Sequence, residues 1–299
     1  FYQAYPIVIE HMFLRKSRTL VPITKCVQRK EDIYTNKKID YGYFEPIYDK
    51  SQPTPDLHFE YRVIGARFVK TLDEFDVNTT ACIFTHPPKG RKWKHRFYAG
   101  TDPINSETGH SKMSSSVWDA LKNGLAGVVF TRDKNFKNSY AQCMLMRIYY
   151  DQCDEGGIKE LVENNIGDMY VDFQETHKYK RNIVANMALN PEYFRKPAGK
   201  WFGVSNKVDT APRILSKTEE MVESYAENIN IPWIWEQFET FVEKDLNSST
   251  THRQTRYQAA DMRYNFDDVI FSATFAYINA MSHAKYEPVD LAALNIENK

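Results

Sequence analysis

Apolar and polar positions recur at strand and helix spacing most clearly between residues 96 and 283. Short apolar runs bounded by Gly, Pro or other turn residues predict strands. Such runs occur at 59–64, 81–84, 97–103, 114–118, 127–130, 158–162 and 201–204. The runs from 97 to 130 follow one another with short connections, which predicts an antiparallel meander.

Helical spacing separates and follows these runs. Ser139 is expected to cap a helix that ends near residue 151, because apolar residues then recur every fourth position. Further helices are predicted at 165–175, 210–228 and 267–281. The last is apolar nearly all round and is therefore expected to be buried. Strands and helices that alternate in this way predict an α/β fold.

A Pro-rich patch at 51–56 reads as an exposed connection and suggests a boundary near residue 50. Residues 1–50, which include a basic segment at 15–38, are expected to be a linker or the remnant of an upstream domain. Residues 51–299 then form the main domain, with its core at about 96–283. Phe1 begins the chain without Met or a charged leader, so we expect a fragment.

Composition limits the partners. The 39 basic and 39 acidic residues cancel, so any nucleic-acid surface must come from local clusters. No run approaches the roughly 18 apolar residues of a membrane span, and no membrane partner is expected. The 4 cysteines are far apart and lack zinc-ligand spacing, so neither a disulfide framework nor a zinc finger is indicated.

Acidic residues stand at the edges of strongly apolar elements: Asp102, Glu163 and the pair Asp267-Asp268. Taken singly, they could begin a turn, lead into a helix cap or favour the positive end of a helix dipole. Carboxylates that converge on one sheet edge instead repel each other unless a divalent cation balances them. Oxygen ligands suit Mg²⁺ or Mn²⁺, and two such ions roughly 4 Å apart can promote phosphodiester cleavage. Together the acids indicate a nuclease centre.

Basic residues cluster in two regions expected to flank Asp102 and Glu163. The first cluster surrounds Trp93 and contains Lys89, Arg91, Lys92, Lys94 and Arg96. The second follows His177 and contains Lys178, Lys180, Arg181, Arg195, Lys196 and Lys200. Each could be a solvated face. We favour phosphate contact, with residues 176–200 as a DNA-contacting excursion, because neutralising the backbone positions a duplex without reading its sequence.

Other polar residues carry weaker signals. The segment 110–112 could approach the acids, although a surface loop is the simpler interpretation. The aspartates expected to be solvated are Asp119, Asp133, Asp154 and Asp172. The serines at 114–116 have no adjacent base at an interpretable spacing, so nucleophilic serine chemistry is not supported.

Four segments resemble the large subunit of tailed-phage terminases. Residues 99–103 (AGTDP) resemble the first-strand G-x-D-P motif of its nuclease domain, and residues 162–167 (VENNIG) resemble its second motif. Residues 266–271 (FDDVIF) resemble its closing D-D helix, which usually carries His where this chain has Phe266. Residues 2–6 (YQAYP) resemble the Q-x-Y-P segment that closes its ATPase domain.

This resemblance implies an RNase H-like fold, with a mixed central sheet and helices on both faces. It implies that Asp102, Glu163 and Asp268 are catalytic and that, with Asp267, they hold Mg²⁺ or Mn²⁺; Asp268 is the preferred member of its pair. The implied activity is cleavage of concatemeric double-stranded DNA during genome packaging, in the host bacterial cytoplasm. The implied partners are DNA, an upstream ATPase domain, the portal and the small terminase subunit.

The terminase nuclease described above is one of three functions that remain open at this point. No G-x-x-x-x-G-K-[ST] phosphate loop occurs, so the ATPase is expected outside this sequence. An RNase H-like resolvase or transposase nuclease explains the acids but not the segment at 2–6. A non-catalytic portal-docking module of the packaging motor would carry the same acids without using them.

Overall fold

The computed structural model describes residues 18–48, 57–65, 80–90, 92–105, 111–133, 135–177, 182–185, 201–206, 210–245, 255–260 and 266–284. Its centre is a 7-stranded sheet in the order β2-β1-β3-β6-β5-β4-β7. The strands are β1 Asp40–Tyr48, β2 Leu57–Gly65, β3 Ala81–Ile83, β4 Phe97–Asp102, β5 Met113–Asp119, β6 Gly124–Thr131 and β7 Lys159–Val162. The antiparallel pairs β4–β5 and β5–β6 form the predicted meander, and β7 runs parallel to β4.

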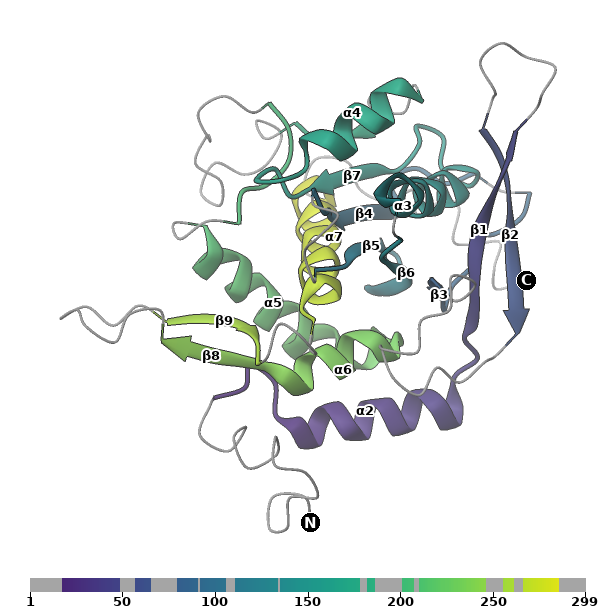
Figure 1. The fold of residues 1–299 in the computed structure, drawn as a ribbon. Coiled ribbons are helices and arrows are strands. Elements are labelled where there is room, and N and C mark those ends of the chain that lie inside the picture. The colour runs from purple at the N-terminus through teal and green to yellow at the C-terminus, as the bar shows by residue number, and fades with distance from the viewer. Residues whose placement is uncertain are drawn as a thin grey trace.

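Helices cover both faces of this sheet (Figure 1). They are α2 Ile23–Asn36, α3 Phe136–Asp151, α4 Asp168–Thr176, α5 Ala211–Tyr225, α6 Pro232–Thr240 and α7 Asp268–Ala284. A short 3-10 turn, Ala226–Asn228, extends α5, and a separate two-stranded sheet pairs β8 Phe241–Asp245 with β9 Thr255–Ala259. The mixed sheet with helices on both faces confirms the predicted α/β architecture.

Two apolar cores lie on opposite faces of the sheet, because side chains alternate along each strand. Tyr98 of β4 and Leu161 of β7 belong to the core under α2, α5, α6 and α7. Phe97, Ala99 and Val162 belong to the other core, under α3 and α4. The alternation therefore decides which face each polar residue of β4 and β7 takes.

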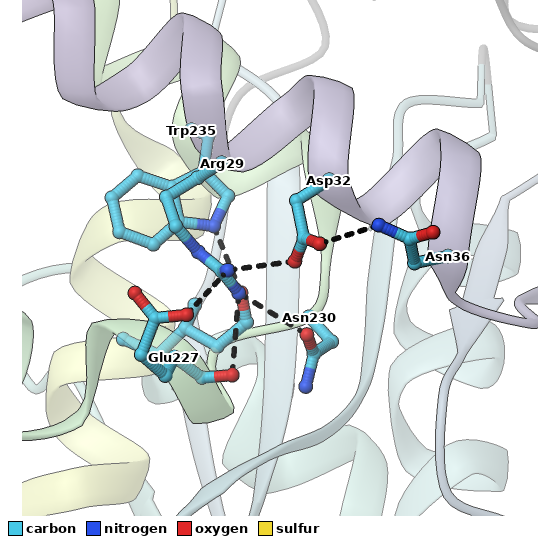
Figure 2. A network of polar contacts seen from close by, with 7 residues as sticks. Arg29, Asp32, Asn36, Glu227, Asn230 and Trp235 are labelled. Carbon is cyan, nitrogen blue, oxygen red and sulfur yellow. Dashed lines mark hydrogen bonds and ion pairs between the residues drawn. The ribbon is translucent and has the colours of Figure 1, made fainter.

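Residues 18–48 pack against the rest of the fold. Figure 2 shows Arg29 of α2 donating hydrogen bonds of 2.8 Å to both Asp32 and Glu227. Arg29 also bonds Asn230 at 3.2 Å, and its guanidinium lies over Trp235, 5.9 Å from the ring centroid. The linker interpretation is wrong for this part of the chain. A buried arginine in the middle of α2, between the buried Cys26 and Ile33, conceals the apolar stripe in the sequence.

Strand β1 joins this same unit. It pairs with β2 on one side and β3 on the other, so the predicted boundary near residue 50 falls between two paired strands. Sequence patterns also miss α6, β8 and β9, which are short. The strand predicted at 201–204 is reduced to two isolated bridges, Phe202 with Ala185 and Val204 with Glu163.

Most predicted elements agree with the structure to within a few residues. An exception is the start of α3, which Asn135 caps by accepting a 3.2 Å hydrogen bond from Lys137 N–H. Ser139 lies one turn inside the helix, where its hydroxyl accepts from Asp133 N–H. No helix in the described ranges is long and apolar enough to cross a membrane.

Candidate active site

Two of the predicted acids lie at the same edge of the sheet. Asp102 ends β4, and Glu163 directly follows β7. The parallel register places Thr101 beside Val162, and Glu163 N–H donates a 3.0 Å hydrogen bond to the Thr101 carbonyl. Side chains two or four residues apart along a strand point to the same face, so Asp102 lies on the face of Tyr98 and Glu163 on the face of Leu161. Both acids therefore lie on the face covered by α7.

Helix α7 approaches this edge closely because β4 carries glycine at its contact point. A Cβ on Gly100 would lie 2.1 Å from Ala276 N and 2.4 Å from Ser272 O. Any larger residue would therefore push the helix away from the strand. The glycine of the G-x-D motif thus lets α7 lie directly on the β4 backbone.

Polar contacts fix the position of α7 along the strands. The Ser272 hydroxyl lies 2.7 Å from the hydroxyls of both Ser114 and Ser116. Farther along α7, Asn279 Nδ2 donates to the carbonyls of Ala99 and Lys159 at 2.9 Å. The N-terminal end of α7, with Asp267 and Asp268, is thereby held over the end of β4.

The carboxyl groups interact electrostatically. Burial, followed by the charges of Glu163 and Asp268 and a hydrogen bond with Glu163, raises the pKa of Asp102 well above its usual range. Burial and the charge of Asp267 raise the pKa of Asp268 as well. Glu163 and Asp268 are only 8% and 7% exposed, while Asp102 retains partial access to solvent. The structure thus brings these predicted acids together.

A side-chain relay orients Glu163. Asn165 Nδ2 donates a 2.7 Å hydrogen bond to Glu163 Oε1, and Asn165 Oδ1 accepts one of 2.9 Å from the Ser205 hydroxyl. Gly203 lets the segment that carries Ser205 lie close to β7, because a Cβ on Gly203 would lie 2.0 Å from Val162 O. Its φ of 70° also favours glycine. The asparagine therefore orients the acid, and α4 begins later, after Gly167.

Asp267 and Asp268 have different surroundings. Asp267 Oδ2 accepts a 3.1 Å hydrogen bond from Ala259 N–H at the end of β9. Gln237 of α6, rather than either acid, accepts the first free N–H groups of α7, from Val269 at 2.8 Å and Ile270 at 3.2 Å. Asp268 raises the pKa of Asp102 more than Asp267 does, which favours Asp268 as the closer partner.

The described residues contain no group of three His, Cys, Asp or Glu side chains already arranged to hold a metal ion. What bears on a cation is the charge distribution: largely buried acids stand close enough to raise one another's pKa values. Carboxylate oxygens are the ligands that Mg²⁺ and Mn²⁺ prefer, and an ion between them would relieve the repulsion. The donor chemistry of these acids therefore suits such an ion, although their side chains are not arranged around one in this structure.

Solved structures with a similar arrangement include phage nucleases. The large terminase nuclease of thermophilic phage G20c aligns at 12% identity and TM-score 0.46, over 68% of this chain and 90% of that chain. The magnesium-bound structure of the same nuclease aligns at 12% identity and TM-score 0.46, over 68% of this chain and 89% of that chain. The Thermus phage P74-26 large terminase nuclease domain aligns at 12% identity and TM-score 0.44, over 68% of this chain and 87% of that chain. No family model and no curated protein matches the chain. These structures belong to the family that the sequence motifs resemble.

The first basic cluster does not lie where it was expected. Lys92 and Lys94 are exposed, but they flank Trp93, whose bridge to Asp154 precedes the start of β7. Parallel strands that start at one edge end at the other, so these lysines lie at the opposite end of β4 and β7 from the acids. Lys94 also lies 3.6 Å from Glu155.

Arg96 leaves this cluster altogether. It is 2% exposed and forms a bidentate pair with Asp119, through Nε to Oδ1 at 3.1 Å and Nη2 to Oδ2 at 3.0 Å. The expectation that Asp119 and Asp154 are solvated is therefore wrong, since they are 1% and 6% exposed. Asp133 and Asp172 do retain access to solvent. Lys89, another predicted DNA contact, is exposed. The remaining predicted DNA contacts lie outside the described residues: Arg91, Lys178, Lys180, Arg181, Arg195, Lys196 and Lys200.

Two residues near the site were missed or given little weight. Glu160 is fully buried on the opposite face of β7, 3.3 Å from Arg147 Nε and 2.5 Å from the Thr101 hydroxyl. Lys112, in the segment first interpreted as a surface loop, donates its N–H to Asp268. An acid inside an apolar strand was the only signal for Glu160, and no local signal separates Lys112 from an ordinary surface lysine.

Proposed function

We propose that this chain is a divalent-metal-dependent endodeoxyribonuclease of the large-terminase type, which cuts concatemeric double-stranded DNA during genome packaging. The observation that carries the proposal is the convergence of Asp102, Glu163 and Asp268 at one sheet edge, with the pKa of Asp102 raised by its acidic neighbours. Their order along the chain is that of the motifs the sequence shares with this family.

In this proposal Asp102, Glu163 and Asp268 bind Mg²⁺ or Mn²⁺, and Asp267 supports them. Two bound ions would supply Lewis-acid stabilisation to the attacking water and to the leaving oxygen of a phosphodiester. The chain's own contribution is positional. Asn165 holds the Glu163 carboxylate, and the contact of α7 with Gly100 sets the distance between Asp268 and Asp102.

DNA would approach along the edge that carries the acids. Near this edge, Ala185 forms an isolated bridge with Phe202, and Val204 forms one with Glu163. Within the predicted excursion at 176–200, Ile183 and Val184 are buried and Ile183 forms a bridge with Glu160, so this part of the segment packs against the sheet. The basic residues of the segment lie outside the described residues and remain predicted DNA contacts. The ATPase domain, portal and small terminase subunit are proposed partners on the strength of the sequence resemblance.

Plasmid cleavage tests the proposal. Supercoiled plasmid is incubated with the protein and Mn²⁺, then Mg²⁺, then a chelator, and nicked and linear products are measured. We expect cleavage with either metal and none with chelator. Asp102→Asn, Glu163→Gln and Asp268→Asn should abolish cleavage, because each removes a carboxylate that binds the ions. Asp172→Asn, an exposed acid on α4, is the matched control and should cleave normally.

Stability in chelator separates a metal site from a structural role. Each of the three site substitutions removes a repelling charge, so the metal-free melting temperature should stay equal or rise slightly. Full cleavage by Asp102→Asn would overturn the proposal. A portal-docking module predicts a different result, in which calorimetry finds the same Mn²⁺ binding with Asp102 present or replaced.

A further inference from the structure

Lys112 lies beside the acids because of its place on β5. It precedes the strand by one residue, and Ser114 pairs directly with Asp102. Lys112 shares the parity of Ser114 and Ser116, whose hydroxyls contact Ser272 on α7. Alternation therefore directs the Lys112 side chain to the face on which α7 begins.

Two aromatic rings hold the ammonium group there. Lys112 Nζ lies 4.2 Å from the centroid of the Phe266 ring and 5.0 Å from that of Phe130. The two rings contact each other edge to face, with their centroids 5.6 Å apart. A cation over such rings is attracted to their negative faces, and partial burial strengthens the attraction. Phe266 also occupies the position where the family that the sequence resembles usually carries His.

The same lysine acts on Asp268. Its main-chain N–H donates to the carboxylate and its charge lowers the pKa of Asp268, against burial and the charge of Asp267, which raise that pKa. Lys112 therefore brings a positive charge to a cluster in which the acids otherwise repel one another. Phe266 lies only two residues before Asp268 in sequence, so one of the two rings and the carboxylate belong to the same short segment.

We propose that Lys112 is a resident counter-cation of Asp268, held by Phe130 and Phe266, which stabilises the metal-free cluster and weakens its affinity for divalent ions. The second effect rests on the proposed function, because it requires that metal binds at these acids. The physical reason is that the aromatic rings keep the ammonium in place, so its positive charge opposes an arriving cation.

A double-mutant cycle in chelator tests the pairing without any metal. Lys112→Met keeps the length of the apolar stem and removes the charge. It should lower the melting temperature by roughly 2–4 °C in the wild-type background and have little effect in Asp268→Asn, which has no carboxylate to neutralise. Lys122→Met makes the same charge change in the exposed turn at the other end of β5 and should show no such dependence. An equal effect of Lys112→Met in both backgrounds would overturn the inference.

Calorimetric Mn²⁺ titration tests the effect on affinity. Lys112→Met should bind Mn²⁺ roughly threefold to tenfold more tightly than wild type, as expected for losing one positive charge near the ion. Lys112→Arg should restore wild-type affinity, and Lys122→Met should match wild type. Unchanged or weaker Mn²⁺ binding by Lys112→Met overturns the inference. Absence of Mn²⁺ binding by the wild type instead overturns the proposed function, while the cycle in chelator still decides the pairing with Asp268.

Discussion

Two buried glutamates, Glu160 in β7 and Glu163 directly after it, lie on opposite faces of the sheet, and their surroundings differ in kind. Glu160 forms an ion pair with Arg147 Nε at 3.3 Å and accepts hydrogen bonds from the Tyr170 hydroxyl at 2.9 Å and Gln174 Nε2 at 2.7 Å. Glu163 faces Asp102, whose pKa it raises. One acid is satisfied by the fold, whereas the other stands among like charges.

The comparison shows that burial alone does not mark a functional acid. Donors around Glu160 supply hydrogen bonds and an opposite charge, so the fold loses stability if that acid is removed. Acids around Glu163 supply repulsion, so the fold tolerates its neutralisation and gains from a cation. The identity of the neighbours, rather than exposure, separates a structural carboxylate from a candidate ligand.

The largest expected effect is on Glu160. Glu160→Ala leaves Arg147 buried without this partner and should lower the free energy of unfolding by about 3–5 kcal/mol. Glu163→Gln should cause no comparable loss. Urea denaturation of both variants in chelator measures the difference. Similar losses in the two variants would erase the distinction drawn between the two faces of β7.

A smaller loss is expected at the contact between β4 and α7. Gly100→Ala places a methyl group within 2.1 Å of Ala276 N, and should lower the free energy of unfolding by about 1–3 kcal/mol. It should also remove the Mn²⁺-induced rise in melting temperature, because α7 carries Asp268 away from Asp102. Gly156→Ala is the control, since its nearest contact is 3.8 Å away. Normal Mn²⁺ stabilisation in Gly100→Ala would show that the spacing is not critical.

Capping of α7 should have a more modest effect. Gln237→Leu removes the acceptor of the Val269 and Ile270 N–H groups, and should cost about 1–2 kcal/mol of stability. Asp268→Asn should cost none in chelator. Thermal unfolding of the two variants compares them directly. If Asp268→Asn were the more damaging change, Asp268 would be a structural cap rather than a ligand.

The smallest expected effect concerns Glu236 of α6, a half-buried acid distant in sequence from Glu160 and Glu163. Burial raises its pKa to about 7, although Lys30 and a hydrogen bond from Tyr34 lower it. Because the folded-state pKa lies above the usual 4.5, the stability from its protonated form is complete below pH 4.5 and is lost as the pH rises through about 7. The free energy of unfolding of Glu236→Gln should therefore exceed that of wild type by about 1 kcal/mol at pH 8, after discounting for partial exposure. At pH 5 the difference should be smaller.

Denaturation of Glu236→Gln at the two pH values measures this change, and Mn²⁺ titration of the same variant should match wild type. Such a result sharpens the comparison, because it shows that a raised pKa without converging acids does not make a metal site. Loss of Mn²⁺ binding in this variant would contradict that conclusion.

Much of the fold could be predicted from local pattern. The meander from 97 to 130, the strand at 158–162 and the buried final helix follow from alternation and helical spacing, which depend only on neighbouring residues. The segment at 23–36 could not be predicted in this way. Its buried Arg29 is compatible with a core only because Glu227, Asn230 and Trp235 arrive from distant parts of the chain.

The same division applies to the candidate site. The sequence by itself determined that acids stand at the ends of apolar elements, and that Gly100 and Asn165 accompany them. Only the tertiary structure decided that the acids share one edge, that Lys92 and Lys94 lie at the other, and that Lys112 stands beside Asp268. The physical reason is that side-chain parity is local, whereas strand direction and helix packing decide which distant charges become neighbours.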